Sequence, residues 1–96
     1  MFIKELLEKA VKTNASDLHL SPGEPVRIRV DGELSPIDEQ KLDAETTKKL
    51  IFSAMDINEQ KAFEKDLELD FIVTYAGIGR FRANAFYEKN GIGAVF

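Results

Sequence analysis

The hydrophobic periodicity of this chain changes along its length, and the order of the changes limits the folds it can adopt. Residues 3–11 and 44–55 place apolar side chains three and four positions apart, the spacing of a helix with one buried face. Residues 15–34 and 67–96 instead alternate apolar and polar side chains, the period of a strand, with short turns between the runs. Helix, strands, helices and strands in this order predict an α+β fold, an antiparallel sheet with flanking helices.

Turn and cap residues mark the ends of these predicted elements. Asn14 suits the left-handed stop of the first helix, Asp43 suits the N-cap of the second, and Asp31-Gly32 suits a tight hairpin turn. A shorter helix is expected from Asn58. The side chains that share one face of each main element are Ile3, Leu6, Leu7, Ala10 and Val11 in the first helix, Leu50, Ile51, Ala54 and Met55 in the second, Leu67, Leu69, Phe71, Val73 and Tyr75 in one strand, and Phe81, Ala83, Ala85 and Tyr87 in the next.

Composition excludes several classes of protein. Ninety-six residues form one domain with a single core, and 44% hydrophobic residues are too many for a disordered chain. The net charge of −4 argues against nucleic acid as a partner, because binding to phosphate backbones needs a broad basic surface. The sequence contains no cysteine, no apolar run of about 20 residues that could span a membrane, and no signal-peptide pattern.

All four arginines of this acidic chain lie in two Arg-x-Arg pairs, Arg27 with Arg29 and Arg80 with Arg82. In a strand, both members of such a pair point to the same face and lie roughly 6.6 Å apart. Two forked guanidinium groups at this spacing suit a carboxylate or a phosphate. Each pair is therefore a candidate anion-binding site.

Both arginine pairs also have a simpler interpretation. Arg80 and Arg82 could form surface ion pairs with Asp70, Glu68 or Glu88 on neighbouring strands, each contributing about 0.2–1 kcal/mol. For Arg27 and Arg29 we expect a solvated face or a face between domains or subunits.

His19 is the only histidine, and it lies beside Asp17 and Ser21 in a predicted strand. A lone histidine without cysteine cannot build a zinc site, and the acidic run at residues 56–70 lacks the spacing of a calcium loop. We therefore expect no metal site, and we expect His19 and Asp17 to be structural residues at a domain boundary. No pair of residues in the sequence resembles a catalytic nucleophile with its base.

The last residues, 93–96, have the pattern of a strand without a cap or a polar tail behind it. From this pattern we expect the 96 residues to be the first domain of a longer protein.

Two segments carry a family resemblance. Residues 15–34, which contain SDLHL, and residues 68–96, which contain RFRAN, are similar to the motor ATPases of type IV pili and type II secretion, and most of all to the PilT-like retraction ATPases. The resemblance covers essentially the whole chain, and residues 38–66 are its least distinctive part. The two motifs are specific in combination and weak separately.

The resemblance implies that residues 1–96 form a single PAS-like N-terminal domain, with a RecA-like ATPase domain absent from this sequence. In that family six chains form a ring, and ATP with magnesium lies between the two domains. Arginines of the N-terminal domain reach the phosphates, and the matching position here is Arg82, with Arg80 as second choice. The implied partners are the RecA-like domain of the same chain, the neighbouring subunits of a homohexamer and the pilus machinery of the inner membrane. The implied location is cytoplasmic, peripheral to that membrane, and the implied role is pilus retraction in twitching motility.

The sequence departs from the family by lacking the nucleotide-binding core. No G-x-x-x-x-G-K-[ST] loop occurs in it, so the chain alone is not expected to hydrolyse ATP, although its parent is expected to be an ATPase. Retraction, extension and secretion motors of this family differ mostly downstream of this region and in their partners. The alternative is a stand-alone PAS-like sensor or adaptor, in which some of the seven phenylalanines line a ligand pocket.

Overall fold

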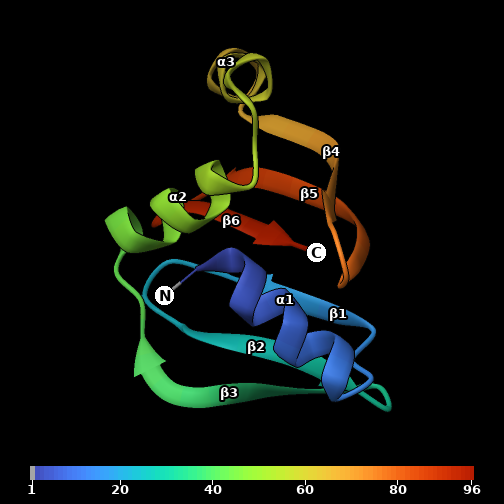
Figure 1. Ribbon diagram of the computed structural model, residues 1–96. Coiled ribbons are helices and arrows are strands. Elements are labelled where there is room, and N and C mark those ends of the chain that lie inside the picture. The colour runs from blue at the N-terminus through green and yellow to red at the C-terminus, as the bar shows by residue number, and fades with distance from the viewer. Residues whose placement is uncertain (1) are drawn as a thin grey trace.

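The computed structural model describes residues 2–96, which form three helices and six strands (Figure 1). In chain order the elements are α1 (Ile3–Lys12), β1 (Asp17–Leu20), β2 (Pro25–Val30), β3 (Glu33–Lys41), α2 (Ala44–Ser53), α3 (Ile57–Asp66), β4 (Glu68–Tyr75), β5 (Gly79–Glu88) and β6 (Gly91–Val95). The described residues contain no helix long and apolar enough to cross a membrane.

The six strands form one sheet in the order β3-β2-β1-β6-β5-β4, and every neighbouring pair is antiparallel. The last strand, β6, lies between β1 and β5, so the first and last strands of the chain are neighbours at the centre of the sheet. The predicted α+β class with an antiparallel sheet and flanking helices is confirmed. The narrower PAS-like assignment stays a prediction.

The hydrophobic core lies on one face of the sheet. Helix α1 packs against β1, α2 packs against β6, and α3 packs against the edge strand β4 (Figure 1). The strands supply the buried side chains Leu18, Leu20, Val26, Ile28, Phe71, Ala83, Ala85 and Ala94 to this face. Because strand side chains alternate, the intervening residues lie on the opposite face, which we call the open face.

The predicted ends of the elements are confirmed where a local signal defines them. Asn14 adopts the left-handed conformation with φ of 58°, directly after α1. Asp43 caps α2 by accepting a hydrogen bond from the backbone N–H of Thr46 at 2.7 Å. Asp31 and Gly32, with φ of 52° and 82°, form the two-residue turn between β2 and β3.

Three residues of the predicted apolar faces are exposed in the structure. Val11 is 48% exposed because the buried side of α1 ends with Ala10. Leu67 is 49% exposed because it is the left-handed C-cap of α3, with φ of 59°, and the strand begins only at Glu68. Tyr87 is 60% exposed because it lies near the β5–β6 turn, beyond the buried alanines of its strand.

Candidate functional site

The open face of the sheet carries both arginine pairs. His19 of β1 lies opposite Arg27 on one side and opposite Val95 on the other, and Val95 lies opposite Asn84 of β5. Residues directly opposite each other in neighbouring strands share a face. Arg80 and Arg82 lie on the same face as Asn84, at alternate positions of β5. The two pairs are therefore on one surface, separated by β1 and β6.

Arg80 and Arg82 make no ion pair among residues 2–96, and both are exposed. Two of the acids considered as partners are otherwise engaged. Asp70 accepts a hydrogen bond from the Asn84 amide at 2.9 Å, and Glu88 accepts one from the Ser21 hydroxyl at 2.6 Å. The surface ion pairs considered for Arg80 and Arg82 are thus absent among the described residues. Both guanidinium groups are available to a ligand.

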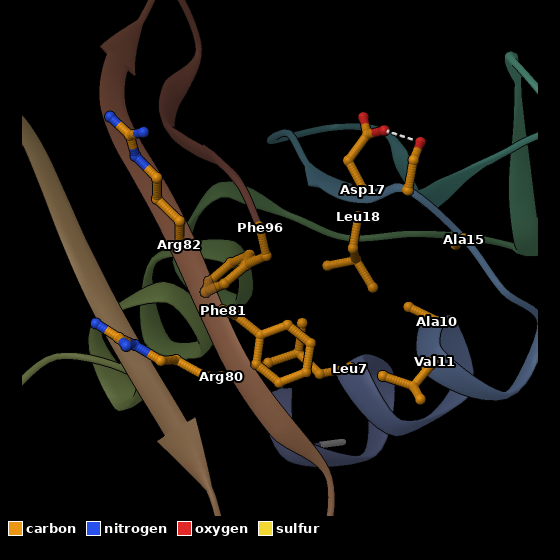
Figure 2. Close-up of a pocket in the computed structure, with 11 residues that line it drawn as sticks. Leu7, Ala10, Val11, Ala15, Asp17, Leu18, Arg80, Phe81, Arg82 and Phe96 are labelled. Atoms are coloured by element: carbon orange, nitrogen blue, oxygen red, sulfur yellow. Dashed lines mark hydrogen bonds between the residues drawn. The ribbon is translucent and has the colours of Figure 1, made fainter.

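A cleft of about 270 Å³ lies between β1, β5 and α1, and Arg80 and Arg82 lie on one side of it (Figure 2). Asp17 lies on the other side. Apolar side chains form much of the lining, with Phe81 pointing toward Leu7 of α1 while the two arginines extend from the opposite side of β5. The remaining lining residues are Ala10, Val11, Ala15, Ser16, Leu18 and Phe96.

Arg27 and Arg29, in contrast, are half-buried and paired. Arg27 donates to the Glu24 carboxylate at 3.0 Å. Arg29 donates from Nε to the Asp17 carboxylate at 3.4 Å and from Nη1 to the Gly32 carbonyl at 3.1 Å. These partners fix both guanidinium groups, so this pair is less available to an anion than the pair on β5.

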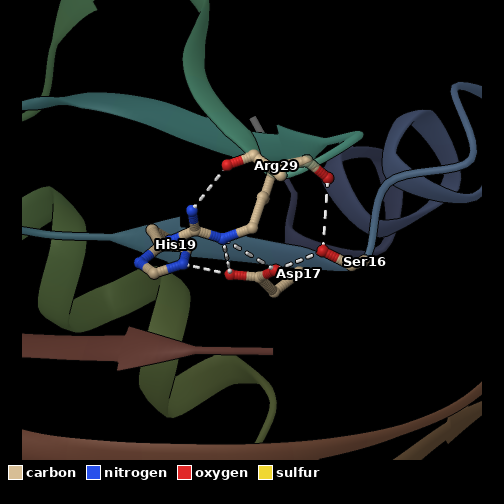
Figure 3. Close-up of polar contacts among 5 residues, drawn as sticks. Ser16, Asp17, His19 and Arg29 are labelled. Atoms are coloured by element: carbon tan, nitrogen blue, oxygen red, sulfur yellow. Dashed lines mark hydrogen bonds and ion pairs between the residues drawn. The ribbon is translucent and has the colours of Figure 1, made fainter.

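Asp17 is the centre of a polar network on the open face (Figure 3). Its carboxylate accepts hydrogen bonds from the Ser16 hydroxyl at 2.5 Å and from Nε2 of His19, and it forms the ion pair with Arg29. The Ser16 hydrogen bond is the largest influence on this carboxyl, and with the His19 and Arg29 interactions it outweighs burial, so the pKa of Asp17 lies below its ordinary value. Asp17 therefore stays ionised near neutral pH.

The structure brings Asp17, His19 and Arg29 together and places Asp17 on the same cleft as Arg80 and Arg82. Sequence reasoning did not identify Glu24 as the partner of Arg27, although the spacing of three residues was visible. It also missed the apolar wall of the cleft at Leu7 and Phe96, because the sequence does not show where α1 crosses the sheet. No group of three or more His, Cys, Asp or Glu side chains in the described part of the chain could hold a metal ion.

Four of the seven phenylalanines pack on one another in two pairs. Phe52 and Phe63 make an edge-to-face contact with ring centres 5.9 Å apart, and Phe71 and Phe96 make another at 6.2 Å. Aromatic pairs of this geometry stabilise a core by about 0.5–1.5 kcal/mol beyond the area they bury.

No protein-family model matches this sequence, but individual proteins and solved structures do. The chain is 46% identical over 96 residues to the type IV pilus retraction ATPase PilT of Pseudomonas aeruginosa, covering 100% of this chain and 28% of that protein. It is 33% identical over 95 residues to the type IV pilus ATPase PilU of the same organism, covering 99% of this chain and 25% of that protein.

A solved structure agrees with these sequence matches. The pilus retraction motor PilT with bound ADP superposes with a TM-score of 0.90 and 35% sequence identity, over 99% of this chain and 28% of that one. The chain thus spans about a quarter of the length of the curated relatives it matches. The predicted resemblance to the N-terminal domain of PilT-like ATPases is confirmed.

Proposed function

We propose that residues 1–96 are the PAS-like N-terminal domain of a hexameric motor ATPase that retracts type IV pili in twitching motility. In this proposal a RecA-like domain of the same polypeptide binds most of the ATP, and the present domain closes over the nucleotide. The relatives support it, because pilus ATPases match the whole chain and are about four times as long. The proposed location is the cytoplasmic side of the inner membrane, next to the pilus machinery.

The observation that carries the proposal is the pair of exposed arginines on β5. Arg82 and Arg80 have no acidic partner among residues 2–96, and they lie at the rim of a cleft. In a chain of net charge −4, two unpaired guanidinium groups side by side favour an anionic ligand. The relative solved with bound ADP makes a nucleotide phosphate the natural candidate for that anion.

Arg82 and Arg80 would act on charge that develops at the phosphates. A guanidinium brought from a second domain can stabilise such charge, and arginines in this role accelerate phosphoryl transfer by about 10³–10⁵-fold. The same contact favours the closed arrangement of the two domains whenever nucleotide is bound. ATP binding would thereby be converted into movement of this domain.

The second arginine pair has a different place in the proposal. Arg27, Arg29, His19 and Asp17 form a face toward the RecA-like domain or a neighbouring subunit, with their geometry fixed by the pairs described above. Magnesium would bind with the ATP in the other domain. We propose no nucleic-acid partner.

The test is ATP turnover of the longer protein with Arg82→Ala, next to a matched control, Lys61→Ala. Lys61 is also an exposed cation but lies on α3, and it makes no ion pair among residues 2–96. We expect turnover to fall at least about tenfold with Arg82→Ala and to stay normal with the control. The isolated 96-residue chain should not hydrolyse ATP. Normal turnover in Arg82→Ala would reject the proposed phosphate contact.

A further inference from the structure

The hydrogen bond between His19 and Asp17 determines which ring nitrogen of His19 carries the proton. An ionised carboxylate accepts hydrogen bonds and cannot donate them. The carboxylate of Asp17 faces Nε2, and its pKa lies below the ordinary value, so it is ionised near neutral pH. Nε2 must therefore carry the proton, and the neutral ring has an unprotonated Nδ1, which is a hydrogen-bond acceptor.

Nδ1 of His19 has no donor within the described residues. Asp17 is the one hydrogen-bond partner that His19 has among residues 2–96, and the side chain is 28% exposed. Its neighbours across the strands are Arg27 on β2 and Val95 on β6. Arg27 is engaged by Glu24, and Val95 offers no polar side-chain atom. The acceptor therefore lies on the open face, available to another molecule or domain.

We propose that Asp17 is a positioning residue, which fixes His19 in its Nε2–H form so that Nδ1 accepts a hydrogen bond from an N–H or O–H group of the surface docked on the open face. This inference rests on the proposed function, since the docked surface is the second domain of the same polypeptide. The matched relatives are about four times as long as this chain, so a polypeptide of their length has room for that second domain. Arg29 and Ser16, also bound to Asp17, hold the carboxylate in place.

The first test is direct, because His19 is the only histidine of the chain. Two-dimensional ¹H–¹⁵N spectra of the 96-residue protein report the protonation of each ring nitrogen. We expect a single tautomer, in which Nε2 is protonated and Nδ1 is unprotonated. Asp17→Ala should relax the ring to the mixture of the two forms found in free imidazole, and Asp17→Glu should restore the single form. A protonated Nδ1, or the same spectrum with and without the carboxylate, would overturn the proposal.

The second test separates the role of Nδ1 from that of Nε2 in the longer protein. In His19→Asn, the amide oxygen can replace the Nδ1 acceptor, whereas in His19→Gln the amide nitrogen can replace the Nε2 donor to Asp17. We expect His19→Asn to keep ATP turnover within about threefold and His19→Gln to lose about tenfold, the value of one buried hydrogen bond. The reverse order, or equal effects, would overturn the proposal. The spectra of the isolated domain do not depend on turnover, so failure of Arg82 as a phosphate contact would leave that first result standing.

Discussion

The two Arg-x-Arg pairs lie on the same face of one sheet, yet their surroundings differ. Arg27 and Arg29 on β2 are half-buried and bound to Glu24, Asp17 and a backbone carbonyl. Arg80 and Arg82 on β5 are exposed and have no acidic partner in the described part of the chain. The same motif thus provides structure in one strand and unpaired positive charge in the other. We call Arg27 and Arg29 the held pair, and Arg80 and Arg82 the free pair.

Strand register accounts for the difference. Arg29 lies directly opposite Asp17 of β1, so the ion pair follows from the pairing of the two strands. Arg82 lies opposite Ile72 of β4 and Arg80 opposite Thr74, and neither side chain can neutralise a guanidinium. An arginine motif therefore becomes a candidate anion site only where the neighbouring strand leaves it without an acid.

The largest loss of stability should follow from removing Asp17, the carboxylate that binds Arg29 of the held pair. Asp17→Ala takes away the acceptor of Ser16, His19 and Arg29 together, which should lower the free energy of unfolding by about 1–3 kcal/mol. Urea unfolding measures this. The control is Asp70→Ala, which removes an exposed acceptor of Asn84 alone and should change stability by less than about 0.5 kcal/mol. Equal losses would show that Asp17 is not the centre of a network.

Arg29→Ala should have an intermediate effect on the held pair. It removes an ion pair and a hydrogen bond to Gly32, but the side chain is 38% exposed, so we expect a loss of about 1 kcal/mol. Arg27→Ala should have a smaller effect, because its partner Glu24 is 46% exposed. Thermal unfolding at one pH would compare the two variants. A larger loss from Arg27→Ala would contradict this order.

The held pair should also make stability depend on pH. The pKa of Asp17 is lower in the folded chain than in the unfolded one, so its contribution is complete above roughly pH 4 and is lost as the pH falls through the folded value. Unfolding of the wild type between pH 5 and 2 should show this loss, and Asp17→Asn should show a shallower fall. Identical slopes would mean that Asp17 does not titrate in this range.

The smallest stability effect is expected for the free pair. Replacing Arg80 and Arg82 together by alanine breaks no ion pair described here, so the free energy of unfolding should stay within about 0.5 kcal/mol of the wild type. Denaturant unfolding at neutral pH would test this. A loss above about 1 kcal/mol would mean that these arginines have a structural role after all.

Sequence patterns predicted the elements whose ends carry their own chemical signal. Asn14, Asp43 and the Asp31-Gly32 turn each act within a few residues, so the local sequence was sufficient. Leu67 was misassigned because an alternating pattern continues smoothly across the end of α3, while the chain there turns through a left-handed cap.

The candidate site was harder to predict, because its contacts depend on how distant strands meet. The two arginine pairs and Asp17 and His19 were identified from their residue types. Their separation into a held and a free pair needed the register of β1 with β2 and of β4 with β5. The insertion of β6 between β1 and β5, which brings Asp17 and Arg82 to one cleft, has no signal in the sequence.

One measurement tests most directly whether the free pair serves a nucleotide. It is ATP turnover of the proposed full-length ATPase carrying Arg80→Ala and Arg82→Ala, the two changes expected to leave stability intact. The account predicts a loss greater than that of Arg82→Ala alone, and at least about tenfold relative to the wild type. Wild-type turnover in this double variant would contradict it and would leave the open-face arginines of β5 without a role in ATP hydrolysis.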